Sequence, residues 1–107
     1  MPGLQILERE DGVIEVIGDV DADSAEPFSD ALTSRRDGDV RLRLAKCSFM
    51  DSSGLRALLL ARQSCDQRNA GFVLLDPSSV VMRLFEVAGL VDHFEIHGRA
   101  STEPGRR

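Results

Sequence analysis

The segment VRLRLA, residues 40–45, sets apolar residues at every second position with arginines between them. Successive side chains of a β-strand point to opposite faces of a sheet, so this alternation predicts a strand with one face in the core and one wetter face. A sheet built from such strands needs helices on one side only. The pattern therefore favours a small sheet whose helices lie mainly on one face.

Four other short stretches, rich in apolar and β-branched residues, also predict strands. They cover residues 4–6, 13–17, 72–75 and 94–96. The turn residues Glu10, Asp11 and Gly12 join the first two of these strands, which predicts an antiparallel hairpin. The second strand is apolar on both faces, so we expect it in a central position of the sheet.

A first helix is expected after the acidic stretch that follows the hairpin. Asp23 with Glu26 three residues later matches a capping box, in which side chains satisfy free backbone N–H groups at the helix start. Pro27 suits a first helical turn, where its missing N–H has no partner in any case. We expect this helix to end near Arg36, before Gly38.

Two more helices are predicted from apolar stripes at helical spacing. The second helix is expected to start within residues 51–53 and to stop at Gly71, a residue suited to a left-handed C-cap. Its buried stripe consists of Leu55, Leu58, Leu59 and Cys65. The third helix opens with residues 76–78 and ends in a Schellman motif at Gly89 and Leu90. Its stripe consists of Val81, Leu84, Phe85 and Ala88.

The order of elements is strand, strand, helix, strand, helix, strand, helix, strand. Strand-helix-strand units favour parallel pairing with right-handed crossovers, while the opening hairpin adds an antiparallel pair. A chain of 107 residues is about the size of one domain with one core. We therefore predict a single α/β domain over residues 1–97, with a small mixed β-sheet and helices mainly on one face. Residues 98–107 lack an apolar period and are predicted to form a disordered tail.

Charge and composition exclude several classes of function. A formal charge of −5 with scattered arginines argues against nucleic acid as a direct partner. No stretch approaches the roughly 18 apolar residues of a membrane span, and the N-terminus lacks the order of a signal peptide. We therefore expect a cytoplasmic protein without membrane insertion. Cys47 and Cys65 fit two reduced apolar residues, and His93 and His97 are too few for a metal site, so no metal or cofactor is expected.

The run Asp51-Ser52-Ser53-Gly54 stands where the second helix begins and is the best candidate for a functional site. It does not match the G-x-S-x-G motif of hydrolases, and Arg56 replaces the lysine of an S-x-x-K motif. Aspartate and serine are favoured helix caps, each worth about 1 kcal/mol, but one cap is enough. A hydroxyl at a helix start can also carry a phosphate, because free N–H donors and the helix dipole stabilise a dianion. Spacing alone does not choose between the two serines as acceptor.

The acidic residues before the first helix raise the question of calcium. Asp19, Asp21 and Asp23 imitate the start of a calcium loop, but Ser24 replaces the required glycine and Asp30 replaces the bidentate glutamate. Calcium binding is therefore not expected. The carboxylates stand at the end of a strand, on a rim where a neighbouring loop can also lie.

Three stretches together resemble the signature of a known family. They are GDVDADSAEPF at residues 18–28, FMDSSGL at residues 49–55 and PSSVVMRLFEVAGL at residues 77–90. In order and spacing they resemble the STAS domain in its bacterial anti-anti-sigma factor (anti-sigma factor antagonist) form. The resemblance covers nearly the whole chain. Many family members carry another helix after the last strand, where residues 97–107 of this chain are short and polar.

The resemblance implies a phosphorylated binding module that regulates transcription and is not an enzyme. Family members bind an anti-sigma factor that is also a serine protein kinase, and this binding releases sigma factor. By the same resemblance Ser52 is the phosphorylated serine. The resemblance also implies that the phosphorylated form dissociates from the kinase and that a PP2C-type phosphatase removes the phosphate. Asp21, Asp51, Ser53 and Gly54 would form the partner-binding rim.

Two alternative functions remain open. A STAS module that is never phosphorylated, acting as a subunit of a lipid-transport or other membrane-associated complex, shares the fold. A single phosphate added to Ser52 by cell extract with ATP and magnesium would favour the phosphorylation switch instead. An esterase-like serine enzyme would react with a fluorophosphonate probe, and we expect no such labelling.

Overall fold

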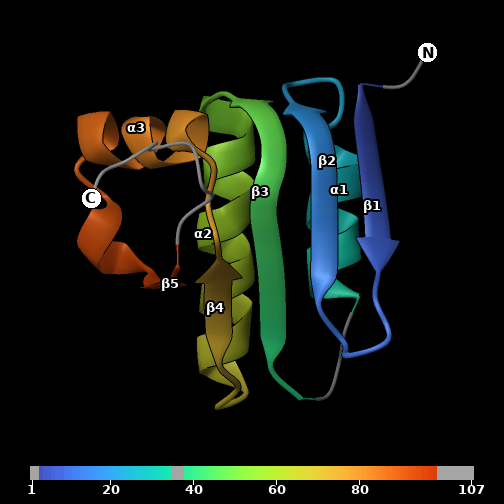
Figure 1. The fold of residues 1–107 in the computed structure, drawn as a ribbon. Coiled ribbons are helices and arrows are strands. Elements are labelled where there is room, and N and C mark those ends of the chain that lie inside the picture. Colours follow the sequence, from blue (N-terminus) through green and yellow to red (C-terminus); the bar gives the residue numbers. More distant parts are fainter. Residues whose placement is uncertain (1–2, 35–37, 99–107) are drawn as a thin grey trace.

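The computed structural model of the protein describes residues 3–34 and 38–98, which form one β-sheet covered by helices (Figure 1). The strands are β1 (Leu4–Glu8), β2 (Ile14–Val20), β3 (Val40–Met50), β4 (Phe72–Leu75) and β5 (Glu95–His97). They lie side by side in chain order, with β1 antiparallel to β2 and the other neighbouring pairs parallel. The predicted mixed sheet and its opening hairpin are confirmed.

Within the described residues, the α-helices are α1 (Ala25–Thr33), α2 (Ser52–Gln67) and α3 (Ser79–Ala88), and a 3₁₀-helix, η1 (Val91–His93), leads into β5. In Figure 1, α1 lies behind β1 and β2, while α2 lies behind β3 and β4. The predicted arrangement, with helices mainly on one face, is confirmed. The predicted stripes of α2 and α3 are buried apart from Leu59 and Leu84, which are half-buried, and Ala88, which is exposed.

The alternation in β3 is the basis of the core. Val40, Leu42 and Leu44 are fully buried, whereas Arg41 is exposed and Arg43 is half-buried on the opposite face. The helices cover the apolar face with buried side chains, which include Phe28, Leu32, Leu55, Leu58, Val81 and Phe85. Burial of apolar surface contributes about 25 cal/mol per Å² and is the main source of stability. The core therefore lies between the sheet and its single layer of helices.

The start of α1 differs from the predicted capping box. Ser24, not Asp23, is the N-cap residue, and its side chain makes no capping hydrogen bond. Instead, Asp21 Oδ1 accepts hydrogen bonds from the backbone N–H groups of Asp23 and Ser24, both at 3.1 Å. An aspartate that bonds the backbone just ahead of it forms a local turn, and this turn redirects the chain from β2 into α1. Pro27 lies in the first turn of α1, as predicted.

The end of α2 also differs from the prediction at Gly71, because the helix stops at Gln67. Asn69 takes the left-handed conformation, with φ of 58°, which asparagine tolerates better than most residues. Gly71 instead lies just before β4 and makes hydrogen bonds to the start of β3. Its N–H donates to Asp39 Oδ1 (2.8 Å), and its carbonyl accepts a hydrogen bond from the N–H of Val40 (2.9 Å).

Two strands extend beyond their predicted ranges, because β2 continues past residue 17 to Val20 and β3 continues past residue 45 to Met50. α3 ends in the predicted Schellman motif at Gly89 and Leu90. α1 ends at Thr33, and its predicted end near Arg36 lies outside the described residues. The predicted disordered tail, residues 98–107, lies outside them too, apart from its first residue, and stays a prediction.

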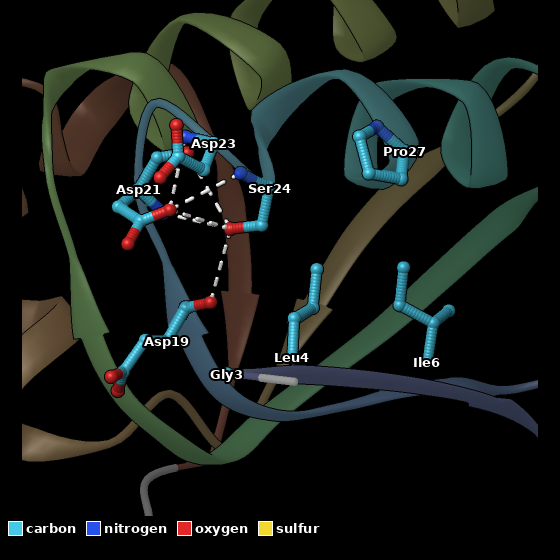
Figure 2. A pocket seen from close by; sticks show the side chains of 8 residues that line it. All are labelled: Gly3, Leu4, Ile6, Asp19, Asp21, Asp23, Ser24 and Pro27. Atoms are coloured by element: carbon cyan, nitrogen blue, oxygen red, sulfur yellow. Dashed lines mark hydrogen bonds between the residues drawn. The ribbon is translucent and has the colours of Figure 1, made fainter. Parts of the chain in front are cut away.

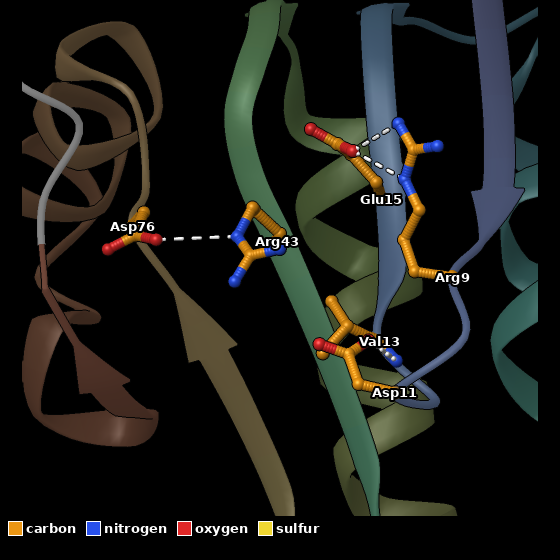
Figure 3. Close-up of polar contacts among 6 residues, drawn as sticks. All are labelled: Arg9, Asp11, Val13, Glu15, Arg43 and Asp76. Carbon is orange, nitrogen blue, oxygen red and sulfur yellow. Dashed lines mark hydrogen bonds and ion pairs between the residues drawn. The ribbon is translucent and has the colours of Figure 1, made fainter.

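The face of the sheet opposite the helices carries ion pairs that the sequence pattern does not reveal (Figure 3). Glu15 is only 7% exposed, and its Oε1 accepts hydrogen bonds from Nε and Nη2 of Arg9 at 2.8 and 2.6 Å. Arg43 on β3 lies near Asp76 after β4, with Nε and Oδ2 3.3 Å apart. The first ion pair joins two residues of the β1–β2 hairpin, and the second joins β3 to the residue that follows β4. Both lie on the side of the sheet without helices.

Replacing Phe28 with alanine tests the packing of α1 on the sheet. Phe28 is fully buried, so its loss leaves a cavity, and we expect the free energy of unfolding to fall by about 3–5 kcal/mol. Urea denaturation followed by circular dichroism measures the change. Val87→Ala is the control, because Val87 is 74% exposed and its truncation should change stability by less than about 0.5 kcal/mol. Equal losses in the two variants would contradict the described core.

Candidate functional site

Two parallel strands end side by side where the motif at residues 51–54 begins. Val20 and Met50 are register partners at the ends of β2 and β3. The backbone N–H of Asp51 donates a hydrogen bond to the carbonyl of Val20 (3.1 Å). Asp21 and Asp51, which follow these two strands, therefore lie next to each other on one rim of the sheet.

The cap of α2 is supplied by Asp51 alone. Its Oδ1 accepts hydrogen bonds from the N–H groups of Ser53 (2.8 Å) and Gly54 (3.4 Å), and its carbonyl accepts one from Leu55 (3.1 Å). A carboxylate at this position also interacts favourably with the helix dipole. Neither the Ser52 nor the Ser53 hydroxyl bonds to any described residue. The two serines are therefore not needed for capping.

The two serines of the motif differ in their exposure. Ser52, the first residue of α2, is exposed, whereas Ser53 is half-buried. Ser53 lines a groove of about 230 Å³ between α1 and α2. Ser52 is therefore the more accessible of the two hydroxyls.

Gly54 allows the first turn of α2 to lie directly on the strand ends. A Cβ atom at this position would be 2.7 Å from Met50 Cγ and from Val20 Cγ1, and 3.2 Å from Val20 Cβ. Such distances are well below the roughly 3.5–4.0 Å at which carbon atoms pack. Gly54 therefore has a steric role in the motif, besides its predicted place on the rim.

Asp21 lies near Asp51, but its carboxylate is directed into its own loop. Its Oδ1 accepts a hydrogen bond from the Ser24 hydroxyl (3.1 Å) in addition to the two N–H groups described above. Figure 2 shows this network beside a pocket of about 480 Å³. The apolar side of that pocket consists of Leu4, Ile6 and Pro27. Asp19, also at the pocket, accepts a hydrogen bond from the Ser48 hydroxyl (2.9 Å).

Phe49 is a candidate binding residue that the sequence analysis does not single out. The register between β2 and β3 shifts twice, first between Glu15 and Ile17, which turns Cys47 inward, and again between Gly18 and Asp19. As a result Phe49 is 45% exposed while Met50 is buried. Exposed aromatic rings are frequent anchors of protein interfaces. The sequence signal is the pair of adjacent apolar residues at 49–50, which breaks the period of two.

The groove between α1 and α2 is a second feature that the sequence analysis misses. Glu26 and Asp30 line it from α1, and Ser53, Arg56 and Leu60 line it from α2. Leu60 is an apolar residue of this groove and is 45% exposed. The available signal is helical spacing, because the three α2 residues lie three and four positions apart and so share one face.

Thiol chemistry and membrane spanning find no support in the described part of the chain. Burial raises the pKa of the Cys47 thiol to about 11, and burial also raises the pKa of the Cys65 thiol. The thiolate is the reactive form of cysteine, so both residues are inert thiols at neutral pH.

Among the described helices, none combines the length and the apolar character needed to cross a membrane.

Comparison with known protein families identifies the class of this domain. The family profile described as "Mlab, STAS domain" matches residues 5–96. The chain therefore belongs to the STAS-domain family, which the three sequence stretches indicate.

Curated relatives narrow this assignment. An anti-sigma-B factor antagonist of Listeria monocytogenes is 37% identical over 98 residues, which cover 87% of this chain and 86% of the relative. The anti-sigma-B factor antagonist of Staphylococcus aureus is 29% identical over 93 residues, which cover 84% and 86%. Within the STAS-domain family, the chain belongs to the group of anti-sigma factor antagonists.

Solved structures share the fold. The anti-sigma factor antagonist SpoIIAA in its unphosphorylated form has a TM-score of 0.65 at 22% identity, covering 87% of this chain and 86% of that protein. An anti-sigma factor antagonist from Mycobacterium paratuberculosis has a TM-score of 0.67 at 18% identity, covering 88% and 83%. At these identities the likeness concerns the fold, and it agrees with the predicted α/β class.

Gly54→Ala tests the close approach of the motif to the strand ends. At an open helical position this substitution stabilises a protein by roughly 0.5–1 kcal/mol. Here we expect the opposite sign, a loss of about 1–3 kcal/mol, because the added methyl group overlaps Val20 and Met50. Urea denaturation measures the change. Ser53→Ala in the same turn is the control and should shift stability by less than about 0.5 kcal/mol; stabilisation by Gly54→Ala would disprove the steric role.

Proposed function

We propose that this protein is an anti-sigma factor antagonist that works as a phosphorylation-controlled binding module and not as an enzyme. In its unphosphorylated form it binds an anti-sigma factor that is also a serine protein kinase, and this binding frees the sigma factor. The kinase phosphorylates Ser52, and the modified protein dissociates. A PP2C-type phosphatase removes the phosphate and restores binding. All of these partners control transcription, so the proposed location is the cytoplasm.

The free and exposed hydroxyl of Ser52 carries this proposal. Asp51 holds the helix start, so no structural hydrogen bond is lost when Ser52 is modified. A phosphate on Ser52 would lie at the first position of a 16-residue helix. There the unpaired N–H groups and the helix dipole stabilise negative charge. The fold tolerates the modification, and its effect falls on the bound partner.

Charge explains how one phosphate can end binding. A phosphoserine adds about −1.5 to −2 charges at neutral pH. Asp21 and Asp51 already place two carboxylates on the same rim. A partner surface that accommodates a neutral Ser52 beside these carboxylates loses electrostatic complementarity when a dianion is added.

Ser52→Ala and Ser52→Asp separate the hydroxyl from the charge. We expect Ser52→Ala to bind the cognate anti-sigma factor kinase within about threefold of the unchanged protein. Ser52→Asp should bind at least about tenfold more weakly, because each tenfold change corresponds to about 1.4 kcal/mol and a misplaced charge costs at least that much. Isothermal titration calorimetry measures both affinities.

Gln63→Asp is the matched control for charge, because it adds one carboxylate to the exposed surface of α2 far from the motif. It should leave the affinity within about threefold of the unchanged protein. Equal affinities of Ser52→Ala and Ser52→Asp would refute the charge mechanism. If mass spectrometry also finds no phosphate on Ser52 after incubation with the kinase, ATP and magnesium, the alternative of a STAS subunit that is never phosphorylated takes precedence.

Phe49→Ala tests whether the exposed ring beside the motif contacts the partner. Interface aromatics often contribute more than about 1.4 kcal/mol, so we expect the affinity for the kinase to fall at least about tenfold. The free energy of unfolding should change by less than about 1 kcal/mol, because the ring is 45% exposed. Val87→Ala, at an exposed position on α3, is the control and should not alter the affinity. An unchanged affinity of Phe49→Ala would exclude the ring from the interface.

A further inference from the structure

Arg56 is a charged side chain without a partner beside the candidate acceptor. It lies four residues after Ser52 and three after Ser53 on α2, and it is exposed. It makes no hydrogen bond or ion pair with any residue of the described ranges. Other arginines are paired, namely Arg9 with Glu15, Arg43 with Asp76 and Arg62 with Asp66. Arg56 is therefore available to a new anionic group.

Helix geometry directs Arg56 toward the first turn of α2. Side chains four residues apart lie on one face, and a long helical side chain covers the turn that precedes its own Cα. Arg56 also lines the α1–α2 groove together with Ser53, which fixes the side of the helix on which it lies. A phosphate on Ser52 would be within reach of its guanidinium group. The order of the pair, with the anion before the cation, is the favourable one on a helix.

We propose that Arg56 forms an ion pair with a phosphate on Ser52 and thereby withdraws from the groove between α1 and α2. The proposal rests on the proposed function, in which Ser52 is the acceptor. The charged residues that line the groove are Glu26, Asp30 and Arg56. Without the phosphate, the guanidinium partly balances the two carboxylates. With it, the guanidinium makes charge-assisted hydrogen bonds to the phosphate oxygens, and the carboxylates lose their counter-charge.

Phosphorylation would then change the surface in two places. The start of α2 gains a dianion, and the adjacent groove becomes more acidic, because its cation has moved. Leu60, an exposed apolar residue of the same groove, keeps its position. A partner that touches both the motif and the groove thus experiences a larger change than the phosphate alone would cause.

Phosphoserine introduced at position 52 during translation tests the ion pair without any kinase. The readout is the second pKa of the phosphate, about 6 in free phosphoserine, followed by ³¹P NMR titration. A nearby guanidinium stabilises the dianion and lowers this pKa. We expect Arg56→Gln to raise it by about 0.2–0.4 unit, the size of a typical helical ion pair. Arg56→Lys keeps the charge and should retain most of the lowering.

Arg62→Gln is the matched control, because it removes the same charge from the same helix further from Ser52. It should leave the phosphate pKa unchanged. The effect of Arg56→Gln should shrink between about 0.01 M and 1 M salt, as the Debye length falls from about 30 to 3 Å. The same phosphate pKa with and without Arg56, or equal shifts in Arg56→Gln and Arg62→Gln, would overturn the proposal.

Failure of the ion pair and failure of the proposed function are distinguishable. A phosphate pKa that depends on Arg56, in a protein that no kinase modifies, would support the ion pair and refute the proposed function. If the kinase phosphorylates Ser52 but the phosphate pKa is the same in the unchanged protein and in Arg56→Gln, the proposed function is supported and the ion pair is refuted. Circular dichroism of each variant reports whether all forms are equally folded.

Discussion

The hydrogen bond from the Asp51 N–H to the Val20 carbonyl joins the start of α2 to the ends of β2 and β3, and the site depends on this junction. It forms because the two strands are parallel and end in register at Val20 and Met50. The first turn of α2 then lies so close to both strand ends that Gly54 has no room for a side chain. The position of Ser52 is therefore fixed by the sheet, since no flexible loop separates it from β3.

The fold could be predicted from the sequence because its strongest signal determines the orientation of the whole sheet. The alternation over residues 40–45 fixes which face of the sheet is buried, since a slip of one residue would expose the whole apolar set. Local signals failed where a neighbouring segment decided the outcome. Asp23 matches a capping box, yet the turn formed by Asp21 places the helix start one residue later. Gly71 suits a left-handed cap, yet Asn69 takes that conformation because the helix ends earlier.

Only part of the candidate site could be predicted from the sequence. The motif at residues 51–54 stands out because three cap-forming residues are more than one helix start requires. The burial of Cys47 was not predictable from the alternation in β3, since it depends on register shifts between two strands. The groove beside Arg56 depends on how α1 packs against α2, which no single segment specifies. Sequence reasoning therefore located the motif at the start of α2 but not the surface around it.

If Ser52 carries a phosphate, the acidity of the chain favours local recognition of that group by a partner. The formal charge is already −5, so a phosphoserine makes the net charge more negative without changing its sign. At physiological ionic strength the Debye length is about 8 Å, and a partner responds chiefly to groups close to Ser52. Asp51 is held there as the helix cap, and Phe49 carries no charge. If Ser52 is the acceptor, Arg56 is then the nearby charge that can move, and its position distinguishes the two states of the surface.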